Sequence, residues 1–245
     1  MLNDKQTHSE QTGNKIKTDL AEIMQKVEEP RLPERAYHIL RTAIKNLVLA
    51  PGKTFLEREI AEMLDMSRTP IREALVRLQT ESMITLVPRK GFVIFPIKKE
   101  DLREIYEITE SLDGLAVELA TNKITTEKLT HLQKLINQQE EALHVHDLHK
   151  WSVLDDQFHA DLITYAENAR LHNVMNTHAD QQYRARLYTI NDRPAPYQSI
   201  TEHKAIITCM EAGDGKAARQ MMQSHRKRAW VEIKKALEEK GSDYE

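Results

Sequence analysis

The order of hydrophobic patterns between residues 31 and 97 constrains the fold more than any other feature of the chain. Apolar residues recur at helical spacing in three segments, and two short apolar runs joined by a Pro-Arg-Lys-Gly turn follow them. The expected helices are 35–50, 57–64 and 67–81, and the expected strands are 84–87 and 92–95. Ser67 is placed to cap the third helix. Two helices, a tight turn, a third helix and a hairpin are the elements of a winged helix-turn-helix.

The third expected helix carries polar and cationic residues at its start, where a recognition helix contacts DNA bases. Arg68 and Arg72 lie one turn apart on the same face, with Thr69 beside them. An arginine can bind guanine O6 and N7 together, and a threonine methyl can contact a thymine methyl. Ser67 and the first N–H groups of the helix are expected near phosphate. A solvated basic helix is the alternative, and for the helix alone it is the simpler explanation.

Residues outside this helix extend the expected DNA interface. Arg58, on the second helix, is suited to a phosphate or to a base edge approached from the side. Arg89 and Lys90 form the tip of the hairpin, where two cations serve no packing purpose. Gly91 at the same tip would let the backbone approach the minor groove. The hairpin therefore favours DNA binding over the solvated-helix alternative.

Charge is unevenly distributed along the chain, which has a formal net charge of −3. Residues 31–98 have twelve Lys/Arg against seven Asp/Glu, a balance of +5, whereas residues 1–30 and 99–245 carry −2 and −6. A basic block of this kind is expected if that block alone meets phosphate, although charge also fluctuates between segments of this size. No apolar stretch approaches the roughly 18 residues of a membrane helix. With Cys209 as the single cysteine and no signal-like N-terminus, we expect a cytoplasmic protein without a membrane partner.

The remaining segments are expected to be helical or polar. Residues 1–30 are predicted to form a polar extension, disordered over 1–14 and helical over 15–28. Residues 98–240 are predicted to form an all-α domain, with helices at 99–122, 126–144, 148–165, 171–190, 199–212 and 215–239. Ser199 and Glu202 have the spacing of a capping box. The predicted fold class is mainly α: a winged helix-turn-helix over 31–97 with a small β-hairpin wing, then a helical bundle.

Four side chains of the second domain could hold a divalent metal. Asp155 and His159 are four residues apart on one expected helix, and His203 and His225 lie on two later helices. Three imidazoles and a carboxylate form a ligand set that leaves positions for water or another ligand. Spacing alone supports the site weakly, because a helical histidine is usually a surface or hydrogen-bonded residue. The same groups would also serve a metal-dependent hydrolase, although no separate general base is evident.

The first domain resembles the N-terminal domain of the GntR family of bacterial regulators. The resemblance rests on Leu56–Glu62, Ser67–Leu75 and the Arg89-Lys90-Gly91 turn, and it covers about residues 33–97. It implies a homodimer that binds a short palindromic operator. It also implies DNA contacts by Arg58, Arg68, Thr69, Arg72 and Gly91. Ser82 replaces the glycine that usually follows the recognition helix, which bears on local stability.

The second domain resembles the FCD effector domain of the FadR subgroup within that family. The matching segments are Asp155–His159, Glu202-His203 and Gly213-Asp214, followed by Ala217 and His225. The resemblance implies that a zinc- or nickel-like ion is held at the floor of a cavity by Asp155, His159, His203 and His225. It also implies an arginine on the first helix for the effector's carboxylate, but Thr109 occupies that place. Arg184 and Arg186 could supply the cation instead, or they could form a surface pair.

These expectations describe a DNA-binding transcriptional regulator rather than an enzyme. We expect a repressor whose affinity for DNA is controlled by a small-molecule effector bound in the metal-containing cavity. An organic acid is one candidate for this effector. Two alternatives remain open at this point. The metal ion could itself be the signal, as in a metal sensor, or the site could be that of a metal-dependent hydrolase.

Overall fold

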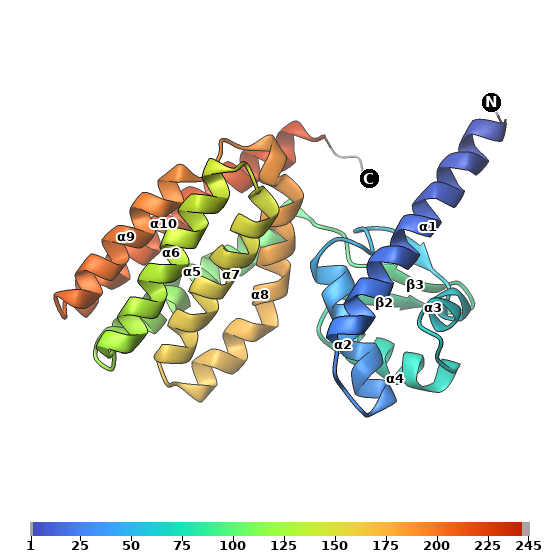
Figure 1. Cartoon of the computed structure of the whole chain (residues 1–245), viewed down its shortest axis with the longest axis horizontal. Helices are drawn as coiled ribbons and strands as arrows, with labels where there is room; N and C mark the ends of the chain where they lie inside the picture. Colours follow the sequence, from blue (N-terminus) through green and yellow to red (C-terminus); the bar gives the residue numbers. More distant parts are fainter. Residues whose placement is uncertain (1, 242–245) are drawn as a thin grey trace. The chain divides into compact units, whose positions relative to one another are not determined.

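The computed structural model describes residues 2–241, with side chains described from Gly13 onward. The chain divides between Ile97 and Lys98 into two compact units, each with its own hydrophobic core. Within residues 2–241, no helix combines the length and the apolar character needed to cross a membrane. The predicted fold class, mainly α with a winged helix-turn-helix followed by a helical domain, is confirmed (Figure 1).

The first unit is a winged helix-turn-helix with one helix added at its N-terminus. Its helices and strands are α1 (Leu2–Lys26), α2 (Leu32–Lys45), β1 (Thr54–Phe55), α3 (Glu57–Met63), α4 (Arg68–Thr80), β2 (Ile84–Val87) and β3 (Gly91–Ile94). The three strands form an antiparallel sheet in the order β1-β3-β2. β1 was not predicted from the sequence, because two residues are too few to show a periodic pattern.

Helix α1 is longer than expected. The sequence predicts disorder over residues 1–14, but α1 begins at Leu2, so this prediction is wrong for the residues that the structure describes. Leu20 is fully buried in the core of the unit, and Ile16, Ile23 and Met24 pack against that core. An anchored segment stabilises the turns next to it, because extending a helix costs far less than nucleating one.

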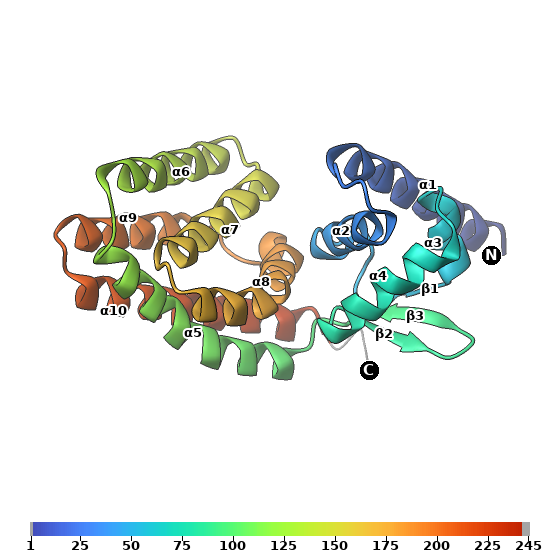
Figure 2. The same cartoon turned by 90° about the horizontal axis from the view of Figure 1, so that it is seen from below.

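The second unit is the predicted all-α domain. Its elements are α5 (Lys99–Thr121), α6 (Thr126–His144), α7 (Leu148–Tyr165), α8 (Ala169–Thr189), the short 3-10 helix η1 (Ile190–Asp192), α9 (Tyr197–Glu211) and α10 (Gly215–Glu239). Figure 2 shows α5 and α10 running side by side, and a Cβ on Gly215 would lie 3.1 Å from the carbonyl oxygen of Glu118 on α5. Polar side chains cap α6, α7, α8 and α10; they belong to Thr125, Asp147, Asn168 and Asp214.

The capping box predicted at Ser199 and Glu202 is wrong. Helix α9 begins two residues earlier, at Tyr197, with Pro196 in the capping position. Ser199 Oγ instead accepts a hydrogen bond from Arg228 Nη2 at 2.9 Å, and Glu202 contacts both Arg228 and His225. Ser199 and Glu202 therefore contact α10 instead of capping α9.

Candidate nucleic-acid interface and metal centre

Helix α4 separates its apolar residues from its cationic residues. Ile71, Leu75 and Leu78 are buried in the core of the winged helix. Arg68 and Arg72 are exposed on the other side of the helix. Since the buried residues fix how α4 sits on α2 and α3, the two arginines are held facing solvent.

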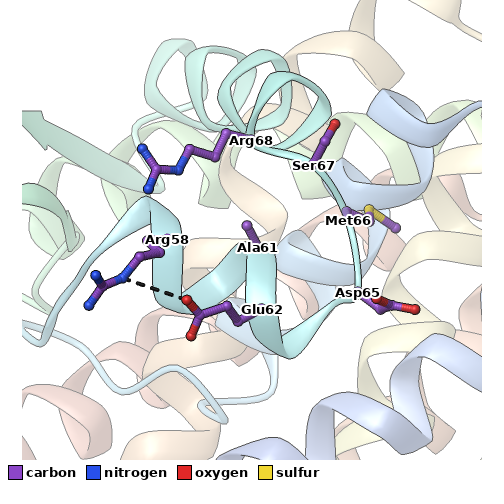
Figure 3. Close-up of a pocket in the computed structure, with 7 residues that line it drawn as sticks. All are labelled: Arg58, Ala61, Glu62, Asp65, Met66, Ser67 and Arg68. Atoms are coloured by element: carbon purple, nitrogen blue, oxygen red, sulfur yellow. Dashed lines mark ion pairs between the residues drawn. The ribbon is translucent and has the colours of Figure 1, made fainter.

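The start of α4 and the middle of α3 line an open pocket (Figure 3). Arg58 and Arg68 extend along the same side of this pocket, and Arg58 Nε lies 3.6 Å from Glu62 Oε1. Ser67 is the N-cap residue of α4, as predicted, but its side chain makes no capping hydrogen bond. Ser67 is exposed, and its hydroxyl is not used to cap the first N–H groups of α4.

Arg72 has a defined partner on the neighbouring helix. Its Nε donates a charge-assisted hydrogen bond to Oε2 of Glu57 at 2.8 Å. Glu57 is the first residue of α3, fifteen residues earlier in the chain. This pairing could not be predicted from the sequence, because it depends on the angle between α3 and α4.

The tip of the wing combines exposed cations with a glycine required by packing. Arg89 and Lys90 are exposed, and Arg89 has a φ of 64°. Gly91 has a φ of 89°, and a Cβ there would lie 2.1 Å from the carbonyl oxygen of Phe55 in β1. The glycine is thus already required by the close approach of β1 and β3.

Three buried histidines from three helices converge in the second unit. His159 of α7, His203 of α9 and His225 of α10 each offer a nitrogen, and these nitrogens lie within 4.8 Å of one another. Asp155 Oδ1 lies 3.9 Å from His159 Nε2 and 3.7 Å from His203 Nε2. The four residues selected from the sequence are therefore brought together in the folded chain.

Hydrogen bonds on the outer side orient two of the imidazoles. His203 Nδ1 lies 3.0 Å from Oε1 of Gln139, and His225 Nδ1 lies 2.7 Å from Oε2 of Glu202. Because both partners are oxygen acceptors, each Nδ1 carries the proton and each Nε2 keeps a lone pair. Burial raises the pKa of Glu202, but hydrogen bonds from His225 and Arg228 outweigh burial and lower this pKa to about 2. Glu202 is therefore an anion that fixes the ring of His225.

The donor atoms of the cluster fit a divalent cation. Among the described side chains, His203 Nε2 and both ring nitrogens of His159 are buried without a hydrogen-bond partner. Burial lowers the pKa of His159 and of His203 well below the ordinary value, so both rings are neutral and able to bind a metal. A buried polar atom without a partner costs about 1–3 kcal/mol. A metal ion would use these lone pairs, and an oxygen ligand from Asp155 is at hand.

The three residues predicted to contact an effector are all buried. Thr109 Oγ1 donates to the carbonyl oxygen of Ile105 at 2.8 Å and accepts from Gln182 Nε2 at 2.7 Å. Burial lowers the pKa of Arg184 to about 10, although Asp180 acts in the opposite direction. The alternative that Arg184 and Arg186 form a surface pair is wrong, because 1% and 5% of these residues are exposed.

Arg186 is held by two carboxylates of α7. Its Nε lies 3.2 Å from Asp155 Oδ2, and its Nη2 lies 2.9 Å from Asp156 Oδ1. Burial lowers the pKa of Arg186, but Asp155 and Asp156 outweigh burial and the net pKa is raised. Arg186 thereby fixes Asp155 beside the histidines.

Several residues near the cluster were missed by sequence reasoning. Arg193 lies between η1 and α9, and its side chain is 5% exposed. Its Nη1 lies 3.6 Å from Glu232 Oε2, while its Nε and the hydroxyl of Tyr106 are buried without a hydrogen-bond partner among the described atoms. Gln139 and Glu202 orient the histidines, and only Glu202 had a sequence signal, its position next to His203. The Glu202 side chain was assigned to helix capping because of its spacing from Ser199.

Comparison with known proteins gives matches over both units. The family described as bacterial regulatory proteins, gntR family, matches residues 32–94, and the FCD domain matches residues 104–228. The chain is 37% identical over 134 residues to an HTH-type transcriptional regulator of Agrobacterium vitis, covering 54% of this chain and 78% of that protein. It is 25% identical to the HTH-type transcriptional repressor RspR of Escherichia coli K12, covering 78% of this chain and 84% of RspR.

Solved structures show the same fold. The structure of McbR/YncC of E. coli has a TM-score of 0.76 at 22% identity, over 85% of this chain and all of that one. A GntR regulator of Rhodococcus sp. RHA1 has a TM-score of 0.69 at 23% identity, over 82% of this chain and 96% of that one. These likenesses cover both units.

Proposed function

The chain belongs to the GntR family of bacterial regulatory proteins and has an FCD domain, so it is a DNA-binding transcriptional regulator, and we propose that it acts in the cytoplasm as a homodimeric repressor on a palindromic operator. The observation that carries this proposal is the exposed Arg68 and Arg72 face of α4, whose opposite face is buried. Two such helices in a dimer would contact half-sites about one turn of DNA apart. Repression is supported by the relative RspR of E. coli, which is a transcriptional repressor.

The contacts are divided between bases and phosphates. Arg68, Thr69 and Arg72 contact base edges, whereas Arg58, Ser67 and the wing residues Arg89, Lys90 and Gly91 contact the backbone or the minor groove. The test is selection of bound duplexes from a random pool. We expect an inverted repeat, and a set of bound duplexes without any shared sequence would contradict the proposal.

In the second unit, Asp155, His159, His203 and His225 hold a divalent ion, zinc or nickel. The buried nitrogens without partners support this assignment, and so does the carboxylate that orients His225. When bound, the ion supplies a positive charge and open coordination positions for an effector. Elemental analysis of the purified protein should find one ion per chain, and a His203→Ala variant should lose it.

The effector is a small organic acid. The ion pairs around the histidines link seven charged side chains: Asp155, Asp156, Arg186, Arg193, Glu202, Arg228 and Glu232. Four of these are acidic and three are basic, so with neutral histidines the group carries −1, and a divalent ion brings it to +1. A monocarboxylate would restore neutrality. Arg193 and Tyr106 offer buried donors for it, in addition to the predicted Arg184, Arg186 and Thr109.

The alternative of a metal sensor uses the same residues. The two regulators differ in a titration of operator affinity with a chelator, with and without candidate acids. An effector-controlled regulator responds to an acid only while the metal is bound, whereas a sensor responds to the metal alone. The alternative of a hydrolase has no support, because the family consists of transcriptional regulators.

A further inference from the structure

We propose that Glu57 determines DNA specificity by holding Arg72 in the orientation that reads a base. This inference rests on the proposed contact between α4 and DNA. It adds a residue that itself need not touch DNA, and that lies on α3 rather than on the recognition helix.

Glu57 is well fixed for this purpose. It is the first residue of α3, where the N-terminal end of the helix favours a negative charge. Only 26% of its side chain is exposed, against 66% for Arg72. The distance of 2.8 Å between Glu57 Oε2 and Arg72 Nε is that of a strong charge-assisted hydrogen bond. The less mobile carboxylate therefore restrains the more mobile arginine.

Glu57 contacts Nε of Arg72, and this contact determines which N–H donors of Arg72 remain available for DNA. A guanidinium has five N–H donors, one on Nε and two on each terminal nitrogen. With Nε bound to Glu57, the Nη1 and Nη2 end remains for a bidentate contact with guanine O6 and N7. Holding one rotamer before binding also reduces the entropy lost when the contact with DNA forms.

An ion pair at the protein surface is expected to add little to folding stability, so folding alone does not require the Glu57–Arg72 pair. A neighbouring pair on the same helix provides a comparison: Arg58 and Glu62 are 3.6 Å apart, and both side chains are more than 60% exposed. That pair links positions four apart on α3, whereas the Glu57–Arg72 pair links α3 to α4. Glu62→Gln is therefore a matched control, because it removes the same charge from the same helix.

The test measures operator affinity at one salt concentration for wild type, Glu57→Gln, Arg72→Ala, the double variant and Glu62→Gln. Each protein is titrated with the selected operator and with duplexes changed at single base pairs. We expect Glu57→Gln to reduce discrimination about five- to tenfold at the one base pair that Arg72→Ala also affects, with other positions unchanged. In the Arg72→Ala background, Glu57→Gln should change discrimination no further. Glu62→Gln should leave the discrimination at that base pair intact.

Three results would overturn the inference. Glu57→Gln could keep full discrimination at every base pair, or reduce it equally in the Arg72→Ala background. It could also strengthen binding to all duplexes equally, which would show that Glu57 only repels phosphate. If Arg72→Ala itself left discrimination unchanged, the proposed DNA contact of α4 would be wrong, which is a different result from a failure of Glu57 alone. Unchanged melting temperatures would show that the variants remain folded.

Discussion

The Nδ1 atom of His225 lies 2.7 Å from Oε2 of Glu202, and Arg228 binds both oxygens of the same carboxylate at 2.7 Å. The carboxylate thus stays ionised and directs the opposite nitrogen of His225 toward His159 and His203. A histidine that binds a metal commonly donates its other N–H to an oxygen acceptor in this way. Two adjacent residues, Glu202 and His203, thus belong to the buried cluster in different ways: His203 is one of its histidines, and Glu202 orients His225.

Replacing Glu202 with glutamine should weaken metal binding about tenfold, because the substitution removes the negative charge behind His225. Affinity can be measured by competition with a chelator of known strength. Glu140→Gln is a suitable control, since Glu140 pairs with Lys204 between exposed side chains on α6 and α9. Equal metal affinity for wild type and Glu202→Gln would show that this carboxylate does not support a metal ligand.

The metal-free protein should lose stability as the pH falls below about 6.5. Burial lowers the pKa of His159, His203 and His225 in the folded chain, while an unfolded histidine titrates near 6.5. Below that pH the unfolded chain binds more protons, so acid favours unfolding by up to about 1.4 kcal/mol per pH unit for each histidine. Thermal unfolding with a chelator present measures this. His203→Gln should make the dependence shallower, and a constant melting temperature between about pH 7.5 and 5.5 would refute the prediction.

Replacing Ser82 with glycine should stabilise the winged helix by about 0.5–1 kcal/mol. Ser82 has a φ of 54°, and it follows the end of α4 in a motif closed by bonds from Ser82 N to Gln79 O and from Met83 N to Leu78 O. A left-handed conformation is costly for serine but not for glycine. Denaturant unfolding compares the two proteins. Glu73→Gly, inside α4, should instead destabilise the protein, and a similar loss for Ser82→Gly would disprove the prediction.

Replacing Gly91 with alanine should destabilise the wing by at least about 2 kcal/mol. The added Cβ would clash with the carbonyl oxygen of Phe55, and the φ of 89° is unfavourable for alanine. Gly213→Ala is a useful comparison, because that glycine also has a positive φ but nothing within 4 Å of the added atom. Because of the clash, Gly91→Ala should lower the free energy of unfolding clearly more than Gly213→Ala does. Equal losses at both positions would show that backbone conformation alone matters.

The sequence was most informative where a pattern repeats over several turns. The six helices of the second unit and the three of the helix-turn-helix have apolar stripes, and each of these helices was predicted from the sequence. Short or anchored elements were less predictable. β1 has two residues, and α1 extends to Leu2 beyond the segment that packs on the core.

The four proposed metal ligands could be selected from the sequence because the resemblance to the FCD domain singled out these positions, whereas their spacing alone supported the site weakly. Gln139, which contacts His203, and Arg193, which pairs with Glu232, could not be selected, because they are common residue types whose role depends on how helices meet. The contact between Glu57 and Arg72 could not be predicted for the same reason. The capping box predicted at Ser199 and Glu202 was wrong because capping-box spacing considers one helix alone. Contacts with α10 instead determine the orientation of these two side chains.

We propose that α4 selects the DNA sequence through its exposed arginines. It is tested most directly by the affinity of wild type and Arg72→Ala for the selected operator and for a scrambled duplex of equal length, at one salt concentration. Arg72→Ala should bind the operator about 10- to 100-fold more weakly, while its affinity for the scrambled duplex should change much less. Operator binding by Arg72→Ala as tight as that of wild type would show that Arg72 does not read the operator sequence.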